Sequence, residues 1–228
     1  TGMRRCGKSY LLFNLFTDAL KAKGVDEENI VQINLEDRRN KSLRDPDKLL
    51  AYIDSRLKDN KMYYILLDEV QLVNEFEDVL NSYLQVKNAD VYVTGSNARF
   101  LSKDVITEFR GRGLEIRVHP LSFSEIRGAR PDEPIEQLWI EYITYGGLPQ
   151  VITMNSDQEK VDYLKGLFKH TYLKDIKERY DIKLDGDLEE LISTLASTVG
   201  GLTNPRKLAD TFRTVKKSTI SQDTIKVY

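Results

Sequence analysis

The strongest constraint on this chain is a glycine-rich octapeptide near its amino end. Residues 2–9, Gly-Met-Arg-Arg-Cys-Gly-Lys-Ser, fit the pattern Gly, four residues, Gly, Lys, then Ser or Thr. Leu12, Leu15 and Ala19 then recur at helical spacing. A glycine-rich loop that opens a helix directs backbone N–H groups at an anion, so this segment predicts a phosphate-binding loop. A glycine-punctuated turn before a helix is the alternative interpretation.

The loop gives separate tasks to its residues. We expect the Lys8 ammonium to bridge the β and γ phosphates of a nucleoside triphosphate and the Ser9 hydroxyl to ligate Mg²⁺. Backbone N–H groups of the loop are expected to surround the phosphates. The predicted cofactor-binding residues are Gly2, Met3, Arg4, Arg5, Cys6, Gly7, Lys8, Ser9, Tyr10 and Ser96.

A pair of carboxylates forms the second motif. Residues 63–67 are a near-continuous apolar run, and Asp68 and Glu69 follow it directly. Open α/β sheets place their ligands at the carboxyl ends of strands. Asp68 is predicted to hold Mg²⁺ through water, and Glu69 to polarise the water that attacks the γ phosphate. The alternative is that the pair only caps the following helix.

Two further segments offer polar groups to the same site. Ser96 and Asn97 follow a short strand at residues 91–93 and are candidates to contact the γ phosphate or orient water. Arg112 is a candidate to neutralise charge on the transferred phosphoryl group, in the same chain or across a subunit contact. Ordinary turn residues and a solvated arginine are the alternatives. The predicted catalytic residues are therefore Glu69, Lys8, Arg112 and Asn97, and the predicted metal ligands are Ser9 and Asp68.

The order of the elements predicts an α/β fold, a three-layer domain with a mainly parallel sheet. Apolar runs without alternation are typical of strands that are buried on both faces. Strands are expected at residues 30–35, 63–67, 91–93 and 114–118, with helices between the first three. No strand pattern precedes the loop, so we expect a fragment that lacks its first strand.

The second part of the chain is predicted to be helical. Helices are expected at residues 135–145, 158–179, 188–199, 205–212 and 222–228. We predict two domains, residues 1–128 and 129–228, the second of which ends in a truncated winged helix-turn-helix. Its local basic residues suit a phosphate backbone or merely a solvated helix face, and winged helices also bind proteins, so DNA and protein partners both stay open.

Composition excludes several classes of protein. The 34 basic and 36 acidic residues give a net charge of −2, which provides no general attraction to nucleic acid or anionic lipid. No apolar run approaches the roughly 18 residues of a membrane span. The single cysteine, Cys6, excludes an intramolecular disulfide, and together with the absence of a secretory signal pattern it favours a cytoplasmic protein. His119 and His170 lack the neighbouring ligands of a zinc site.

These motifs together resemble a known family, the predicted AAA-like ATPases related to archaeal ATPases. The matching segments are residues 2–9, 66–71, 94–97, 111–112, 120–125 and 145–149, in the order found in that family. Pro-Leu-Ser-Phe at 120–123 and Gly-Gly-Leu-Pro at 146–149 carry most of the specificity. The resemblance implies an ATPase domain with a helical, winged-helix-containing region after it, Ser96 or Asn97 as a sensor of the γ phosphate, and Arg112 as a stabiliser of charge.

Three functions remain open on the sequence. The first is magnesium-dependent hydrolysis of ATP that drives or gates the helical domain. The second is a nucleotide-gated module that binds DNA or protein and hydrolyses slowly. The third is a P-loop kinase, which Glu69 disfavours because a kinase needs no water-polarising carboxylate beside the metal ligand. Oligomerisation stays open in each case.

Overall fold

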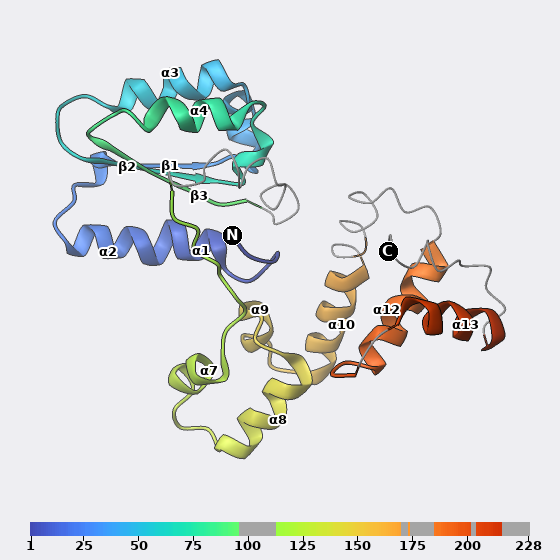
Figure 1. Cartoon of the computed structure of the whole chain (residues 1–228). Helices are drawn as coiled ribbons and strands as arrows, with labels where there is room; N and C mark the ends of the chain where they lie inside the picture. The colour runs from blue at the N-terminus through green and yellow to red at the C-terminus, as the bar shows by residue number, and fades with distance from the viewer. Residues whose placement is uncertain (96–112, 170–172, 174–184, 202–203, 216–228) are drawn as a thin grey trace. The chain divides into compact units, whose positions relative to one another are not determined.

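The computed structural model in Figure 1 describes residues 1–95, 113–169, 173, 185–201 and 204–215 of the chain. By its contacts the chain divides into two compact units, Thr1–Ser156 and Asp157–Tyr228. The domain boundary predicted after residue 128 is a separate division of the chain, and it stays a prediction.

A three-stranded parallel sheet lies at the centre of the first unit. Its strands are β1 (Ile30–Asn34), β2 (Tyr63–Asp68) and β3 (Ala89–Val93), in the order β1-β2-β3. In register, Asn34 of β1 lies opposite Asp68 of β2. The parallel α/β arrangement that the sequence predicts is therefore present, and the carboxyl ends of β1 and β2 meet at one edge of the sheet.

Helices cover both faces of this sheet, which gives three layers (Figure 1). One face carries α3 (Pro46–Arg56) and α4 (Phe76–Tyr83), and the other carries α1 (Lys8–Tyr10), a π-helical segment (Leu11–Phe16) and α2 (Thr17–Ala22). The side chains of successive residues in β2 point to opposite faces of the sheet. Ile65 and Leu67 join the core under α3 and α4, whereas Leu66 packs with Leu12 and Leu20. The apolar run of β2 is continuous because both faces are buried.

Helix α3 shows how local sequence fixes an element in place. The Asp45 side chain accepts a hydrogen bond from the Lys48 N–H at 3.1 Å, and Pro46 occupies the first turn. Leu49 and Ile53, four residues apart, are then fully buried against the sheet. The remaining short turns in this region are 3₁₀ segments at Glu27–Asn29, Arg38–Arg44 and Val70–Leu72.

The strand predicted at residues 114–118 is wrong in extent. Only Val118 forms a bridge, and its parallel partner is Gly2. The Val118 N–H donates to the Thr1 carbonyl at 2.8 Å, and the Thr1 ammonium donates to the Ile116 carbonyl at 2.7 Å. These contacts, to Thr1 and Gly2, form an isolated bridge and not a ladder.

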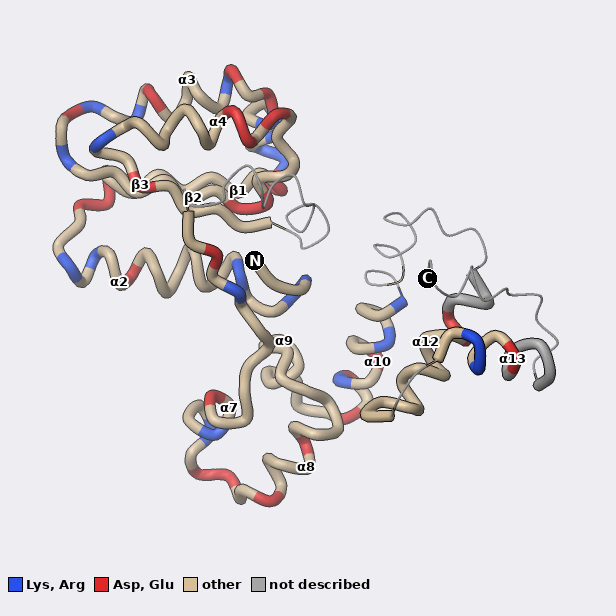
Figure 2. The backbone as a smooth tube through the Cα atoms, in the orientation of Figure 1, with Lys and Arg blue, Asp and Glu red and all other residues tan. Residues whose placement is uncertain are grey.

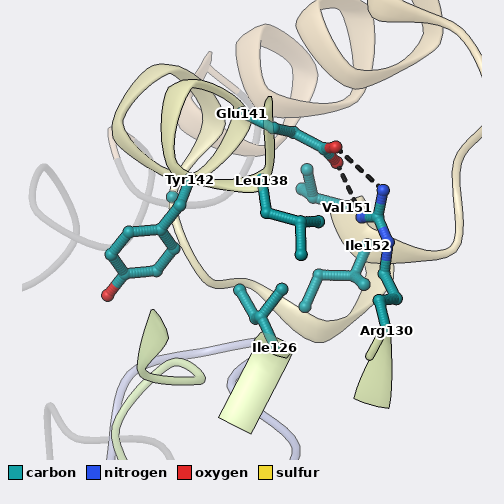
Figure 3. A pocket seen from close by; sticks show the side chains of 8 residues that line it. Ile126, Arg130, Leu138, Glu141, Tyr142, Val151 and Ile152 are labelled. Carbon is teal, nitrogen blue, oxygen red and sulfur yellow. Dashed lines mark hydrogen bonds and ion pairs between the residues drawn. The ribbon is translucent and has the colours of Figure 1, made fainter. Parts of the chain in front are cut away.

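Three helices follow in the same unit: α7 (Phe123–Ala129), α8 (Ile135–Tyr145) and α9 (Pro149–Ile152). Ser122 and Glu125 form a reciprocal capping box at the start of α7. A small pocket lies among these helices, and Arg130 donates to Glu141 beside its apolar side chains (Figure 3). It is lined by Ile126, Arg130, Leu138, Glu141, Tyr142, Gly146, Val151 and Ile152. None of the predicted nucleotide-site residues lines this pocket.

The second unit is helical where the structure describes it. Its helices are α10 (Asp157–Leu167), α12 (Asp185–Ser197) and α13 (Pro205–Val215). Leu191 of α12 and Ala209 of α13 are buried in a small cluster with Leu195 and Leu208. The helix predicted at residues 222–228 lies outside the described residues, so the winged helix-turn-helix stays a prediction.

Charge is mixed over the described elements. Lysine and arginine are interspersed with aspartate and glutamate along the tube in Figure 2, in agreement with a net charge of −2. Within the described part of the chain, no helix combines the length and the apolar character that a bilayer crossing requires.

Candidate functional site

The glycines of the octapeptide are required by backbone geometry. Gly2 has φ 147° and Gly7 has φ 98°, conformations that L side chains rarely adopt. A β-carbon on Gly2 would overlap the Val118 carbonyl oxygen. Gly7 directly precedes Lys8, the first residue of α1, so the loop opens the helix as the sequence predicts. Arg5, with φ 66°, adds a left-handed non-glycine residue to the loop.

Lys8 is turned into the loop rather than toward solvent. Its side chain is 7% exposed, and its Nζ donates to the carbonyls of Gly2 at 3.1 Å and Met3 at 3.0 Å. A buried ammonium needs such acceptors to offset its lost hydration. The loop therefore closes around the cation that is predicted to contact phosphate.

The two predicted metal ligands meet at the end of β2. Ser9 donates from Oγ to Asp68 Oδ1 at 3.0 Å across 59 residues of sequence. Asp68 is 2% exposed, and its Oδ1 also accepts a hydrogen bond from the Thr94 hydroxyl. A hydroxyl and a carboxylate oxygen are ligands of the hard kind that Mg²⁺ prefers. The donor set thus fits the ion that the sequence implies.

Glu69 leaves the sheet in an unusual backbone conformation. Its φ and ψ are 56° and 46°, in the left-handed region that a glutamate seldom adopts. Its N–H donates to Thr94 Oγ1 at 3.3 Å, and its Oε2 accepts from the Gln71 side-chain amide. The next N–H, that of Val70, donates to the Thr94 carbonyl at 3.0 Å. Thr94 therefore holds the backbone of Glu69, and Gln71 holds its carboxylate.

The remaining predicted site residues divide into three groups. Tyr10 is 61% exposed, Met3 is 36% exposed and Arg4 is also exposed, so all three present side-chain area to solvent. Cys6 is buried with its Sγ 3.5 Å from the Val118 carbonyl oxygen, as a small residue that fills the loop. The third group lies outside the described residues and stays predicted from the sequence: Ser96, Asn97 and Arg112.

Two residues at the site were not assigned roles by the sequence. Thr94 follows β3 directly and contacts both acidic residues, and its position at a strand end is a signal that could have marked it. Gln71 lies in the Val70–Leu72 turn and is 8% exposed. Gln71 ends the matched segment 66–71, a signal that includes it without assigning it a role, because its contact with Glu69 depends on that turn.

The Gly-Gly-Leu-Pro segment packs against the same region. The Leu121 N–H donates to the Gly147 carbonyl at 2.7 Å, and a β-carbon on Gly147 would overlap the Leu121 carbonyl. A β-carbon on Gly7 would lie 3.7 Å from Pro149 Cγ. Pro149 therefore lies beside the glycine-rich loop, although 142 residues separate it from Gly7.

Comparison with known proteins agrees with this geometry. Residues 1–127 match a family model described as an AAA domain, and residues 136–228 match one described as a domain of unknown function. An uncharacterized protein of Haemophilus influenzae is 34% identical over 233 residues, which cover 100% of this chain and 58% of that protein. An uncharacterized protein of Methanocaldococcus jannaschii is 27% identical over 222 residues, 92% of this chain and 48% of that protein. The chain spans about half the length of these curated relatives.

Proposed function

The chain belongs to the AAA domain family, and on that premise we propose that it binds ATP with Mg²⁺ and hydrolyses it to drive or gate its helical region. The observation that carries the proposal is the meeting of Ser9 Oγ and Asp68 Oδ1 at 3.0 Å. This pair brings the end of the loop to the end of β2, where a parallel sheet holds its ligand.

Ser9 and Asp68 would hold the magnesium ion, and Lys8 would contact the phosphates with the loop N–H groups. Bound Mg²⁺ would polarise phosphate oxygens and neutralise the charge on them. Lys8 is already surrounded by acceptors, the carbonyls of Gly2 and Met3, which a phosphate oxygen would replace. The whole proposed binding loop is Gly2, Met3, Arg4, Arg5, Cys6, Gly7, Lys8, Ser9 and Tyr10, with Ser96 after β3.

Glu69 is the proposed general base. Its carboxylate accepts a proton from water as the water oxygen forms a bond to the γ phosphorus and the bond to the ADP oxygen breaks. Asp68 is assigned to the metal instead, because it is 2% exposed and its Oδ1 already contacts Ser9 Oγ, the other proposed ligand. Glu69 is partly exposed, so water can reach its carboxylate. A water-polarising carboxylate beside the proposed metal ligand favours hydrolysis over transfer of the phosphate to another acceptor. Asn97 is proposed to orient the water, and Arg112 to stabilise charge in cis or in trans.

Substitution of the two charged groups tests the proposal. Phosphate release from ATP is measured with and without Mg²⁺, and nucleotide binding is measured separately by titration. Glu69→Gln is expected to lower the rate at least about 100-fold while binding persists, since a general base contributes that much. Lys8→Ala is expected to weaken binding. Exposed residues supply matched controls, Glu75→Gln and Lys23→Ala. A rate that Glu69→Gln leaves unchanged contradicts the assignment.

We propose DNA or a protein as the partner of the carboxy-terminal helices. Arg206 and Lys207 are exposed in the first turn of α13, in a region that the sequence predicts to form a winged helix-turn-helix. Duplex DNA is titrated into the protein at several salt concentrations, with and without ATP. Phosphate contacts must weaken as salt rises. If no DNA binds at low salt, the proposal is reduced to a protein partner.

A further inference from the structure

We propose that Gln71 is a positioning residue that aims the Glu69 carboxylate at the attacking water. The inference rests on the proposed hydrolysis and adds a residue to it. The Gln71 Nε2 donates directly to Glu69 Oε2. An amide that holds one carboxylate oxygen leaves the other oxygen to accept the proton, which is the arrangement of a base oriented by a third group.

Gln71 is itself held rigidly enough for this task. It lies in the Val70–Leu72 turn between Val70, which is fully buried, and Val73, which is 2% exposed. The turn is closed by hydrogen bonds from the Leu72 N–H to the Glu69 carbonyl at 3.0 Å and from the Val73 N–H to the Val70 carbonyl at 2.9 Å. The Val70 N–H donates to the carbonyl of Thr94, the residue directly after β3, at 3.0 Å. A partner that is anchored in the core can orient a side chain that is partly exposed.

The backbone of Glu69 supports the same interpretation. A left-handed glutamate persists only where its surroundings enforce the conformation, and such residues concentrate at functional sites. Here the enforcing contact is the hydrogen bond from the Glu69 N–H to Thr94 Oγ1. Thr94 therefore fixes the backbone and Gln71 fixes the side chain. Three rotatable bonds would otherwise let the carboxylate turn away from the site.

Asn34, a second side-chain amide at this end of the sheet, makes hydrogen bonds to the turn after β1. Asn34 lies opposite Asp68 in register, but its Oδ1 accepts from the N–H groups of Glu36 at 2.8 Å and Asp37 at 3.2 Å. Asn34 thus shapes the turn that follows β1. Among the described contacts of Glu69, the amide donor to its carboxylate is Gln71.

The test compares Gln71→Met with Gln32→Met in the whole 228-residue chain. Methionine keeps the length of the side chain and removes the donor. Gln71→Met is expected to lower kcat by about 10- to 100-fold, the usual effect of losing an orienting contact, with KM and the dissociation constant for MgATP within about 2-fold. Gln32 donates to Thr17 at 2.6 Å on β1, away from the carboxylates, so Gln32→Met should leave kcat unchanged.

A double-mutant cycle separates positioning from a structural role. If Gln71 acts through Glu69, then Gln71→Met causes no further loss of residual hydrolysis in a Glu69→Gln chain. Gln71→Glu, which keeps the shape and places a second carboxylate beside Glu69, gives a second variant with an expected loss at least as large. An equal loss in both backgrounds, a loss confined to binding, or an unchanged or raised kcat overturns the proposal. Absence of hydrolysis in the unaltered chain overturns the proposed function and this inference together, whereas normal hydrolysis with an inert Gln71→Met overturns the inference alone.

Discussion

Carboxylates are held in two different ways within Thr1–Ser156. At the carboxyl end of the sheet, the described donors to Asp68 are the hydroxyls of Ser9 and Thr94, and both donors are neutral. Among α7 and α8, by contrast, Arg130 forms ion pairs with both Glu133 and Glu141, the second at 3.0 Å. The helical cluster satisfies its charge internally, while the sheet edge keeps a 2% exposed carboxylate without a described cation. Negative charge that is buried without a counterion costs stability, and a site that binds a metal cation can justify that cost.

The largest test of this comparison is Asp68→Asn. The amide still accepts from Ser9 and Thr94 but removes the charge that would hold Mg²⁺. Magnesium-dependent hydrolysis is expected to fall about 1000-fold, since a Lewis-acid ion supplies several kcal/mol to the transition state. The melting temperature without Mg²⁺ should stay equal or rise, because a buried charge is lost. A lower melting temperature would show that Asp68 is mainly structural.

Gly147→Ala tests the helical side of the comparison, which depends on close packing. A β-carbon there would overlap the Leu121 carbonyl, and backbone cannot move aside cheaply. We expect the free energy of unfolding to drop by about 3 kcal/mol, the upper part of the usual range for overpacking. Gly128→Ala is the control. Gly128 lies within α7 with open space around it, so alanine should stabilise the helix by about 0.5–1 kcal/mol. Urea unfolding of both variants measures the difference.

The sequence predicts these two regions unequally. Helix α8 has the bounds that its pattern predicts, and β2 brings Asp68 to Ser9 of the loop, since a strand buried on both faces has an unambiguous apolar run. The sequence prediction omits α7, although Ser122 and Glu125 form a capping box, a pattern that marks a helix start. Residues 114–118 have a strand-like composition, but a strand also requires a neighbouring strand to pair with. The composition of the segment does not reveal whether such a neighbour is present.

The site follows the same division. Ser9 meets Asp68, and Lys8 turns into the loop, because a loop, a helix start and a parallel strand have known geometry. Gln71 ends the matched segment 66–71, but its contact with Glu69 could not be predicted, because its amide reaches Glu69 only through a 3₁₀ turn and a left-handed backbone. Neither the turn nor the backbone conformation has a signature in the residue types involved. Contacts that depend on irregular backbone are therefore the part of the site that required the structure.

Glu141→Gln tests the same comparison between the sheet edge and the Arg130 ion pairs, with a smaller expected loss of stability. The change removes one of the two carboxylates paired with Arg130, whose side chain is 24% exposed, while Glu133 remains. A stability loss of about 1–2 kcal/mol is expected, as for a partly buried hydrogen bond between charged groups. Hydrolysis of MgATP at a temperature where the protein is folded should be unchanged. A parallel loss of kcat would mean that the ion pair serves the reaction and that the two regions are not separate in function.

The smallest loss of stability is expected for Tyr83→Phe. This substitution tests whether a neutral hydrogen-bond donor to a carboxylate is by itself a sign of function. Tyr83 donates to Asp54 Oδ1 at 2.8 Å and so joins α4 to α3 in the core, as Ser9 joins the loop to Asp68. Loss of this hydrogen bond should cost about 1 kcal/mol with no change in kcat.

The same residue predicts a pH dependence of stability. Burial raises the pKa of Tyr83, and the hydrogen bond to the Asp54 carboxylate raises it further. The folded state therefore keeps a proton that the unfolded chain loses above a pH of about 10, and the stability of the unaltered protein falls as pH rises beyond that point. Tyr83→Phe should remove this contribution to the pH slope, and an unchanged slope in urea unfolding between pH 9 and 11 would assign it to other groups.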